Sequence, residues 1–343
     1  MASEAASTPT VPEPSISEVE ADERLARDQL DLIAAVAKAD HRFRAEDHRG
    51  AAAYYTFAMK RAPSGPRGGH LDRATAMVDW LAQRFRHHIL SSLEAAGLHE
   101  SEWPARFRKA VQILLGDRER DLVTERFPQL PRRFFYPDLP YVDFIDPGRF
   151  AWRATVEQQF GAMREEASGL LAATQDFAPY VAKAAGRPQG DAHGLMENPD
   201  WSTLYLWTNG GPVESNIERC PTIYNTIMDN VPLCHIGTSV PSVLLSLLRP
   251  GAHIPPHSGM MNIRYICHLP LIVPPRCRFR VGERVIEWRE GQIIAFDDTV
   301  EHEAHNGSTM DRLVLIFDVW NPNLTETEQR LIRTLIETVE SYH

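Results

Sequence analysis

Histidines and an arginine that could do chemistry stand close together in the C-terminal half of the chain. The sequence has 14 histidines, and two of them, His257 and His302, precede Arg312, which opens the apolar run LVLIFDVW. Two histidines on one face can hold a divalent metal ion, and a non-haem iron site normally adds one carboxylate. An arginine in an apolar strand can bind a carboxylate through both arms of its guanidinium. This pattern predicts a metal site beside a carboxylate-binding site.

A glycine stands where an iron site of that kind would place its acid. In jelly-roll iron enzymes the acid lies two residues after the first histidine, and here that residue is Gly259, in HIPPHSGMMN. A single histidine near a strand is more often a hydrogen-bonded core or surface residue than a ligand. Spacing alone therefore does not decide whether His257 and His302 bind a metal or are structural residues. We expect Asp297 and Asp298, at the end of GQIIAFDD, to cap a turn and orient His302 rather than bind a metal.

Three motifs around these residues resemble the aspartyl/asparaginyl β-hydroxylase family. They are PGAHIPPHSGMMNIRYICHLPLIVP, EWREGQIIAFDDTVEHEAHN and DRLVLIFDVWNPNLT, and the likeness runs from about Phe134 to Asn323. Members of this family use Fe(II), 2-oxoglutarate and O2, and two histidines hold their iron while a glycine replaces the acid. The resemblance therefore implies an enzyme, a 2-oxoglutarate-dependent dioxygenase that hydroxylates an unactivated carbon. By family default this carbon is the β-carbon of an Asp or Asn residue.

Carried over position by position, the resemblance assigns roles to individual residues. The iron ligands and catalytic pair would be His257 and His302. The residues that hold 2-oxoglutarate would be Ser246, His268 and Arg312. The residues that contact the substrate would be Trp207, Asn209 and Arg264. Strand parity places Arg264, Ile266 and His268 on one face.

Two positions depart from the family pattern. The family's second substrate-side arginine is Ile266 here, and its glutamine is Asn209. Losing one cation weakens the case for an anionic aspartate side chain as the substrate, although Arg264 still implies an anionic or carbonyl group near the metal. The substrate stays open between a peptide or protein residue, a free amino acid, another small metabolite and a lipid acyl chain.

Two other functions fit the same residues. A 2-oxoglutarate-dependent halogenase also lacks the acid and binds a halide in its place. A non-catalytic jelly-roll module could instead bind a peptide through the helical part of the chain. We favour an enzyme, because a binding module has no physical need for two histidines together with Ser246 and Arg312.

The periodicity of the sequence divides the chain into parts that must position this site. Residues 24–125 show apolar residues at helix spacing. Within them Ala51, Tyr55, Ala58 and Pro63 follow the spacing of the second helix of a tetratricopeptide repeat. Only one such unit is visible and about three are needed for a solenoid, so we expect a TPR-like helical cap on a larger domain rather than a peptide-binding array.

The rest of the chain is predicted to hold the catalytic core. Residues 126–149 read as a proline-rich connector laid over a surface. Residues 150–343 begin with a helix, continue as short β-rich runs with a hairpin around Gly282, and end in a helix capped by Thr325. The predicted fold is α+β, a double-stranded β-helix (jelly-roll, cupin-like) core with flanking helices.

Composition limits the class of protein. A hydrophobic content of 43% and a charged content of 24% are ordinary for a globular protein. A net charge of −10 without a basic run argues against a nucleic-acid partner. Residues 1–23 read as a disordered acidic tail without a secretory signal, and no apolar run reaches the ~20 residues of a membrane span. Four cysteines without CxxC spacing indicate reduced thiols, so we expect a cytoplasmic protein.

Overall fold

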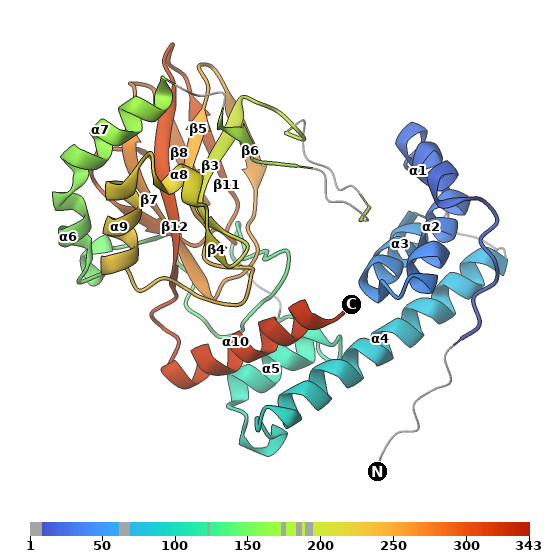
Figure 1. Ribbon diagram of the computed structural model, residues 1–343. Coiled ribbons are helices and arrows are strands. Elements are labelled where there is room, and N and C mark those ends of the chain that lie inside the picture. Colours follow the sequence, from blue (N-terminus) through green and yellow to red (C-terminus); the bar gives the residue numbers. More distant parts are fainter. Residues whose placement is uncertain (1–8, 62–68, 122–123, 173–175, 183–186, 189–194) are drawn as a thin grey trace. The chain divides into compact units, whose positions relative to one another are not determined.

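The computed structural model describes residues 9–61, 69–121, 124–172, 176–182, 187–188 and 195–343. The chain forms two compact units, one helical and one of mixed helix and sheet (Figure 1). Unit 1 comprises residues 1–99, 183–190 and 338–343, and unit 2 comprises residues 100–182 and 191–337.

Unit 1 is helical, as the periodicity predicts. Its helices are α1 (Glu18–Arg27), α2 (Leu32–Arg44), α3 (His48–Arg61) and α4 (Gly69–Ala95). Helix α3 packs against both α2 and α4, and Ala51, Tyr55 and Ala58 are fully buried in the core between them. Pro63 lies outside the described residues. The helical character is confirmed, whereas the likeness to a tetratricopeptide repeat stays a prediction.

The disordered tail predicted for residues 1–23 is too long. Residues 1–8 lie outside the described part of the chain, but helix α1 already begins at Glu18. The ammonium group of Lys38, on α2, lies 2.9 Å from Glu18 and 2.7 Å from Asp22. Glu18 and Asp22, which composition assigns to a disordered tail, thus connect α1 to α2 through Lys38.

Unit 2 is built on two antiparallel sheets. The larger sheet has the order β1-β10-β7-β12-β5-β3-β2, with β4 paired to β3. Its strands are β1 (Phe144–Ile145), β2 (Ala178–Pro179), β3 (Trp201–Thr208), β4 (Gly211–Pro212), β5 (Val243–Leu248), β7 (Arg264–Ile272), β10 (Ile294–Phe296) and β12 (Arg312–Trp320). The smaller sheet has the order β6-β11-β8-β9. Its strands are β6 (His253–His257), β8 (Cys277–Val281), β9 (Arg284–Glu287) and β11 (His302–Asn306).

The connections from β5 to β12 pass repeatedly between the two sheets. Strands β5, β7, β10 and β12 belong to the larger sheet, and β6, β8, β9 and β11 belong to the smaller one. This alternation is the topology of a jelly roll. The hairpin predicted around Gly282 joins β8 to β9, and this glycine has a φ of 56°, a backbone region that favours glycine.

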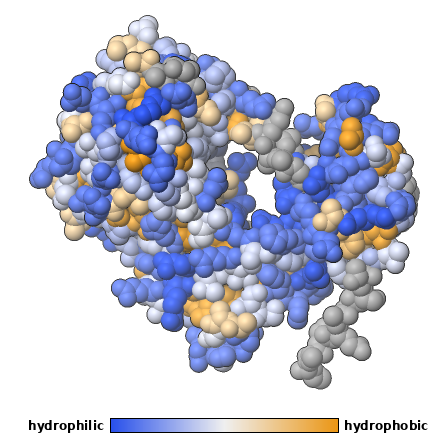
Figure 2. Space-filling view, in the orientation of Figure 1, coloured by the Kyte–Doolittle hydropathy of each residue, from blue (hydrophilic) through white to orange (hydrophobic). Residues whose placement is uncertain are grey.

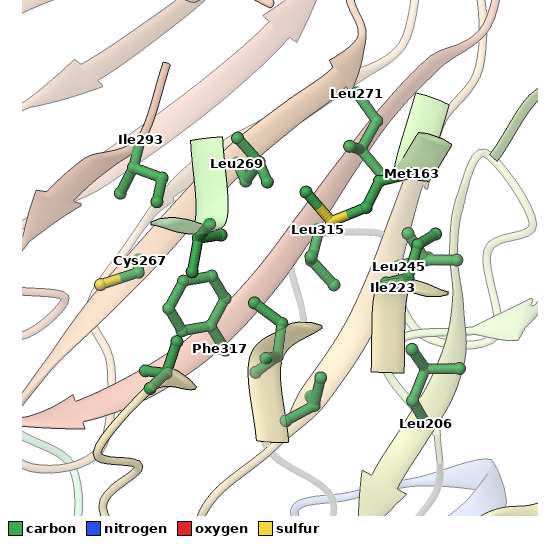
Figure 3. Packing of buried hydrophobic residues seen from close by; sticks show 14 of the residues in the cluster. Met163, Leu206, Ile223, Leu245, Cys267, Leu269, Leu271, Ile293, Leu315 and Phe317 are labelled. Carbon is green, nitrogen blue, oxygen red and sulfur yellow. The ribbon is translucent and has the colours of Figure 1, made fainter. Parts of the chain in front are cut away.

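Helices cover the outer face of the larger sheet. The helices of unit 2 are η1 (Glu100–Glu102), α5 (Ala105–Leu114), η2 (Pro147–Arg149), α6 (Arg153–Gln158), α7 (Phe160–Leu171), α8 (Glu214–Ile217), α9 (Pro221–Asn230) and α10 (Glu326–Ser341). Figure 3 shows Met163 of α7 and Ile223 of α9 beside Leu245, Leu315 and Phe317 of the sheet, in one buried cluster. The single helix predicted after residue 150 is therefore two helices, α6 and α7, on this face.

The two-residue period of the strands decides which side chains reach the space between the sheets. On β5 and β12, Leu245 and Leu315 face the helices. Their neighbours one position away point to the opposite face. The buried side chains on that opposite face include Ser246, His268 and Arg312. The parity argument for β7 is confirmed.

The division between the units differs from the boundary predicted at residue 125. Helix α5 belongs to unit 2, where Arg106 donates to both carboxylate oxygens of the buried Glu328 on α10, at 2.9 and 2.7 Å. The hydroxyl of Tyr136 donates to the same carboxylate at 2.8 Å. Thr325 and Glu328 also form a reciprocal cap at the start of α10. One carboxylate thus joins α5, the connector and α10.

All four cysteines are buried and free, as predicted: Cys220, Cys234, Cys267 and Cys277. Burial raises the pKa of Cys234 and Cys267 well above the ordinary value. These thiols therefore stay protonated and act as small apolar core residues.

The outer surface is predominantly polar on the face drawn in Figure 2. Hydrophilic residues cover most of that face, and apolar residues gather only in small patches. Among the described helices, none combines the length and the apolar character that a membrane crossing requires.

Replacing Glu328 with alanine should destabilise unit 2 by about 2–3 kcal/mol, because it leaves Arg106 and Tyr136 without their shared acceptor. Urea unfolding followed by tryptophan fluorescence would measure this loss. Glu326→Ala, at an exposed position of the same helix turn, is the matched control and should change stability by less than about 0.5 kcal/mol. Equal effects of the two substitutions would contradict the assigned role of Glu328.

The same carboxylate predicts a pH dependence. Burial opposes ionisation, but hydrogen bonds from Arg106, Thr325 and Tyr136 outweigh it and lower the pKa of Glu328 to about 2. The stabilisation is therefore present above the unfolded-state pKa of about 4.3 and is lost as the pH falls toward 2. The stability difference between the wild type and Glu328→Ala should shrink over that interval.

Candidate active site

The two histidines predicted as metal ligands face each other across paired strands. His257 ends β6, His302 begins β11, and they are partners in the antiparallel register. Their ring centroids are 4.1 Å apart. Neither strand stands out in the sequence, because β6 carries Pro255 and Pro256 and β11 is polar. Strand β6 lies at the edge of its sheet, where missing amide donors are tolerated.

Backbone carbonyls fix both imidazole rings in the same way. The Nδ1 atom of His257 lies 2.8 Å from the carbonyl oxygen of Pro255, and that of His302 lies 3.0 Å from the carbonyl oxygen of Val300. A carbonyl can only accept, so each Nδ1 donates and each neutral ring carries its lone pair on Nε2. Burial, together with His257, lowers the pKa of His302 to about 3.

Two imidazoles at this spacing suit a divalent transition metal. Among the described residues, no group of three or more His, Cys, Asp or Glu side chains is arranged to hold a metal ion. A metal bound here would therefore have two ligands from the described part of the protein.

The Asp298 carboxylate explains why residue 259 is glycine. A Cβ atom on Gly259 would lie 1.9 Å from Oδ2 and 2.1 Å from Cγ of Asp298. The Gly259 amide also donates to the backbone carbonyl of Asp298 at 2.6 Å. An acid at residue 259 cannot be placed without displacing a buried carboxylate. The predicted metal site thus lacks the acid for a steric reason that is visible in the fold.

Arg264 holds that carboxylate in place. Its guanidinium lies 3.0 Å from Oδ2 of Asp298 and also pairs with Asp318, and all three side chains are buried. Burial raises the pKa of Asp298 to about 7, although Arg264 opposes the rise. The expectation that Asp297 and Asp298 orient His302 is wrong, because His302 Nδ1 bonds to a backbone carbonyl. Asp297 does cap the turn, through the amide of Thr299.

Arg312 is a buried cation without a carboxylate partner among the described residues. It is 1% exposed, its Nη2 donates to Ser246 Oγ at 3.2 Å, and its Nε has no hydrogen-bond partner in the described part of the chain. Burial lowers the pKa of Arg312 to about 10, so it stays protonated at neutral pH. Ser246 Oγ also accepts from Trp201 Nε1 at 3.2 Å, which leaves the serine proton available to a ligand. An anion would satisfy both side chains.

His268 is the third histidine of the site. It is buried, and its Nδ1 has no partner among the described residues. Burial and the nearby Arg312 and His302 hold the pKa of His268 well below its ordinary value. A neutral imidazole with an unused nitrogen can therefore donate to or accept from a bound ligand.

These side chains line one cavity of about 370 Å³ between the two sheets. The structure brings together six of the predicted site residues there: Ser246, His257, Arg264, His268, His302 and Arg312. The apolar lining consists mainly of Leu244, Ile254, Ile266, Phe279, Phe296 and Ile316. The cavity combines a polar end around the histidines and arginines with apolar walls.

Trp207 and Asn209 do not line this cavity. A register shift between Tyr205 and Trp207 turns the Trp207 side chain toward the helix-covered face, where it packs on that core. Asn209 lies in the turn after β3, with a φ of 52°. The substrate contacts predicted for both are therefore not supported by their positions. Trp201, stacked on Tyr180 with ring centroids 4.2 Å apart, lines the cavity instead.

The proline-rich connector contributes to the cavity, which the sequence reasoning missed. The amides of Arg132 and Arg133 donate to the carbonyls of Gly259 and Met260, each at 3.0 Å. Ser258 Oγ donates to the carbonyl of Leu130 at 2.9 Å. Both arginine side chains line the cavity and are exposed. No local sequence pattern predicts that residues 130–133 contact residues 258–260, because the two segments lie far apart in the chain.

Gly259→Ala should cost about 2 kcal/mol of stability, because its Cβ would overlap the fixed Asp298 carboxylate. The added cost should disappear in an Asp298→Ala background, which removes the overlapping atoms, and chemical unfolding of the four-member mutant cycle measures this coupling. Gly161→Ala is the control, since a Cβ there meets nothing within 4 Å. An equal cost of Gly259→Ala in both backgrounds would contradict the steric explanation.

Comparison with known proteins identifies related sequences. A sequence model described as aspartyl/asparaginyl beta-hydroxylase matches residues 157–322, which include all eight predicted site residues. Aspartate beta-hydroxylase domain-containing protein 2 of Rattus norvegicus is 30% identical over 261 residues, 74% of this chain and 71% of that protein. Aspartyl/asparaginyl beta-hydroxylase of Homo sapiens is 34% identical over 149 residues, 43% of this chain and 19% of that protein.

A relative whose name gives a different substrate also matches. Ornithine lipid ester-linked acyl 2-hydroxylase of Rhizobium tropici is 29% identical over 190 residues, 54% of this chain and 63% of that protein. The chain spans about half the length of several other relatives that it matches. On the extent of the rat match and the position of the matching family model, this chain belongs to the aspartyl/asparaginyl β-hydroxylase family.

Proposed function

We propose that the protein is an Fe(II)- and 2-oxoglutarate-dependent hydroxylase. The observation that carries the proposal is the buried Arg312 guanidinium, which has no carboxylate partner among the described residues and lines the same cavity as His257 and His302. A buried charge without a counter-ion is costly, and a bound carboxylate would offset that cost. His257 and His302 would hold the iron, and Arg312 with Ser246 would hold the distal carboxylate of 2-oxoglutarate.

The residues present fit both groups. Each imidazole carries its lone pair on Nε2, as metal binding requires, and the unused nitrogen of His268 lies in the same cavity. The bound iron and co-substrate would supply the activation of O2 for hydroxylation of an unactivated C–H bond. Because the site provides two protein ligands, more coordination positions remain for the co-substrate, water and oxygen than in a site with three.

The protein's own contribution is orientation and exclusion of water. Backbone carbonyls fix both imidazole rings, and Arg264 fixes Asp298 against Gly259. The apolar walls formed by residues such as Phe279 and Phe296 limit the water that reaches the reacting carbon.

Hydroxylation is favoured over halogenation by the relatives, all of which carry hydroxylase names. Those names include an Asp/Asn hydroxylase and a lipid acyl hydroxylase, so they support the reaction type more than the substrate. The alternative of a non-catalytic binding module gives no reason for a buried arginine that lacks a carboxylate partner among the described residues and shares a cavity with two histidines.

Anaerobic addition of Fe(II) and 2-oxoglutarate should produce the visible charge-transfer band of a chelated iron complex. Arg312→Gln should weaken 2-oxoglutarate binding by about 10- to 100-fold, because it removes a charge-assisted contact to the carboxylate. Titration of the band measures this affinity. Arg149→Gln, at an exposed arginine that does not line the cavity, is the matched control and should bind normally.

Two outcomes would contradict the proposal. A wild-type protein without the band would refute the co-substrate assignment. A chlorinated product in the presence of chloride, instead of a hydroxylated one, would refute the hydroxylase assignment.

A further inference from the structure

The charge of Arg264, the cation that the sequence places on the substrate side, is already balanced within the protein. Its two partners, Asp298 and Asp318, are buried carboxylates. Asp318 is itself fixed, since its second oxygen accepts the Ser242 amide at 2.7 Å. An acidic group entering this end of the cavity would lie beside two carboxylates that share one cation. Like charges at short range in a buried site repel strongly, so this end disfavours an acidic substrate group.

The walls between that end and the opening suit an uncharged chain. Ile266 lines the cavity on the same face of β7 as Arg264 and His268. It occupies the position at which the family pattern has a second arginine, so this wall is apolar. Ile254 and Ile316 continue the apolar surface from the facing strands β6 and β12. Burying apolar carbon against such walls is favourable by about 25 cal/mol per Å².

Positive charge is instead found at the mouth of the cavity. The side chains of Arg132 and Arg133 are exposed there and line the opening. Arg133 donates to Ser239 Oγ, and no carboxylate among the described residues forms an ion pair with Arg132. Met260 and Tyr180, beside them in the lining, are 47% and 42% exposed. The mouth therefore combines two cations with exposed apolar surface.

We propose that the substrate is an anionic amphiphile, whose apolar carbon chain enters the cavity while its carboxylate or phosphate binds Arg132 and Arg133 at the mouth. The connector is rigidly placed for this role, because its amides bond to the same segment that follows His257. Arginine suits both anions through paired hydrogen bonds. The inference rests on the proposed function for the reaction, but the binding mode can be measured without iron or turnover.

Calorimetric titration of the full chain with octanoate, octyl phosphate, octylammonium and N-acetylaspartate tests the proposal. The wild type should bind both eight-carbon anions more tightly than octylammonium or N-acetylaspartate. Arg132→Glu should weaken the eight-carbon anions about 10-fold or more and strengthen octylammonium. The octanoate and octyl phosphate arms show which anion the mouth prefers.

Two controls separate the mouth from other sites. Arg149→Glu makes the same charge change away from the cavity and should leave all affinities unchanged. Arg132→Lys keeps the positive charge at the mouth and should retain more of the octyl phosphate affinity than Arg132→Glu. Circular dichroism and thermal unfolding confirm that the variants are folded.

The proposal is overturned if Arg132→Glu leaves the affinity for both eight-carbon anions unchanged. It is also overturned if N-acetylaspartate binds the wild type most tightly. Failure of the proposed function would show separately, as a wild type that forms no iron and 2-oxoglutarate complex.

Discussion

The antiparallel pairing of β6 with β11 is the constraint on which the site depends. It places His257 opposite His302 and brings both rings to one face, so that each Nδ1 reaches a carbonyl of its own strand segment. The segments that flank this pair are tied together as well, since Gly259 bonds to the backbone of Asp298. That close approach leaves no room for a side chain at residue 259. The ring geometry and the missing acid thus have a common cause.

Two buried arginines in the same cavity have opposite surroundings. Arg264 has two carboxylates within the protein, and Arg312 has a serine hydroxyl but no carboxylate among the described residues. A buried cation that is fully paired is a structural element, because its charge is already balanced. A buried cation without an anion is stable only at a cost, and proteins retain such groups where a ligand supplies the charge. On this difference, Arg264 stabilises the structure of the pocket, whereas Arg312 is the cation available to bind a ligand.

Much of this arrangement follows from sequence periodicity, and the rest follows from contacts between distant segments. Short β-rich runs predict β5, β7 and β12, and the two-residue period of a strand predicts the common face of Arg264 and His268. This approach fails for β6, whose prolines are tolerated only at a sheet edge, and for Trp207, which a bulge turns to the other face. The resemblance to a known family supplies the pairing of His257 with His302. The placement of Arg132 at the mouth depends on hydrogen bonds to Gly259 that no local pattern encodes.

The central claim is that His257, His302 and Arg312 form one site for a metal and a dicarboxylate. The most direct measurement is a crystal structure with Mn(II) and 2-oxoglutarate, with anomalous diffraction recorded to locate the metal. The account predicts one anomalous peak within bonding distance of Nε2 of both His257 and His302, and 2-oxoglutarate with its distal carboxylate on Arg312 and Ser246. Metal bound elsewhere, or a carboxylate on Arg264 while Arg312 stays unpaired, would contradict it.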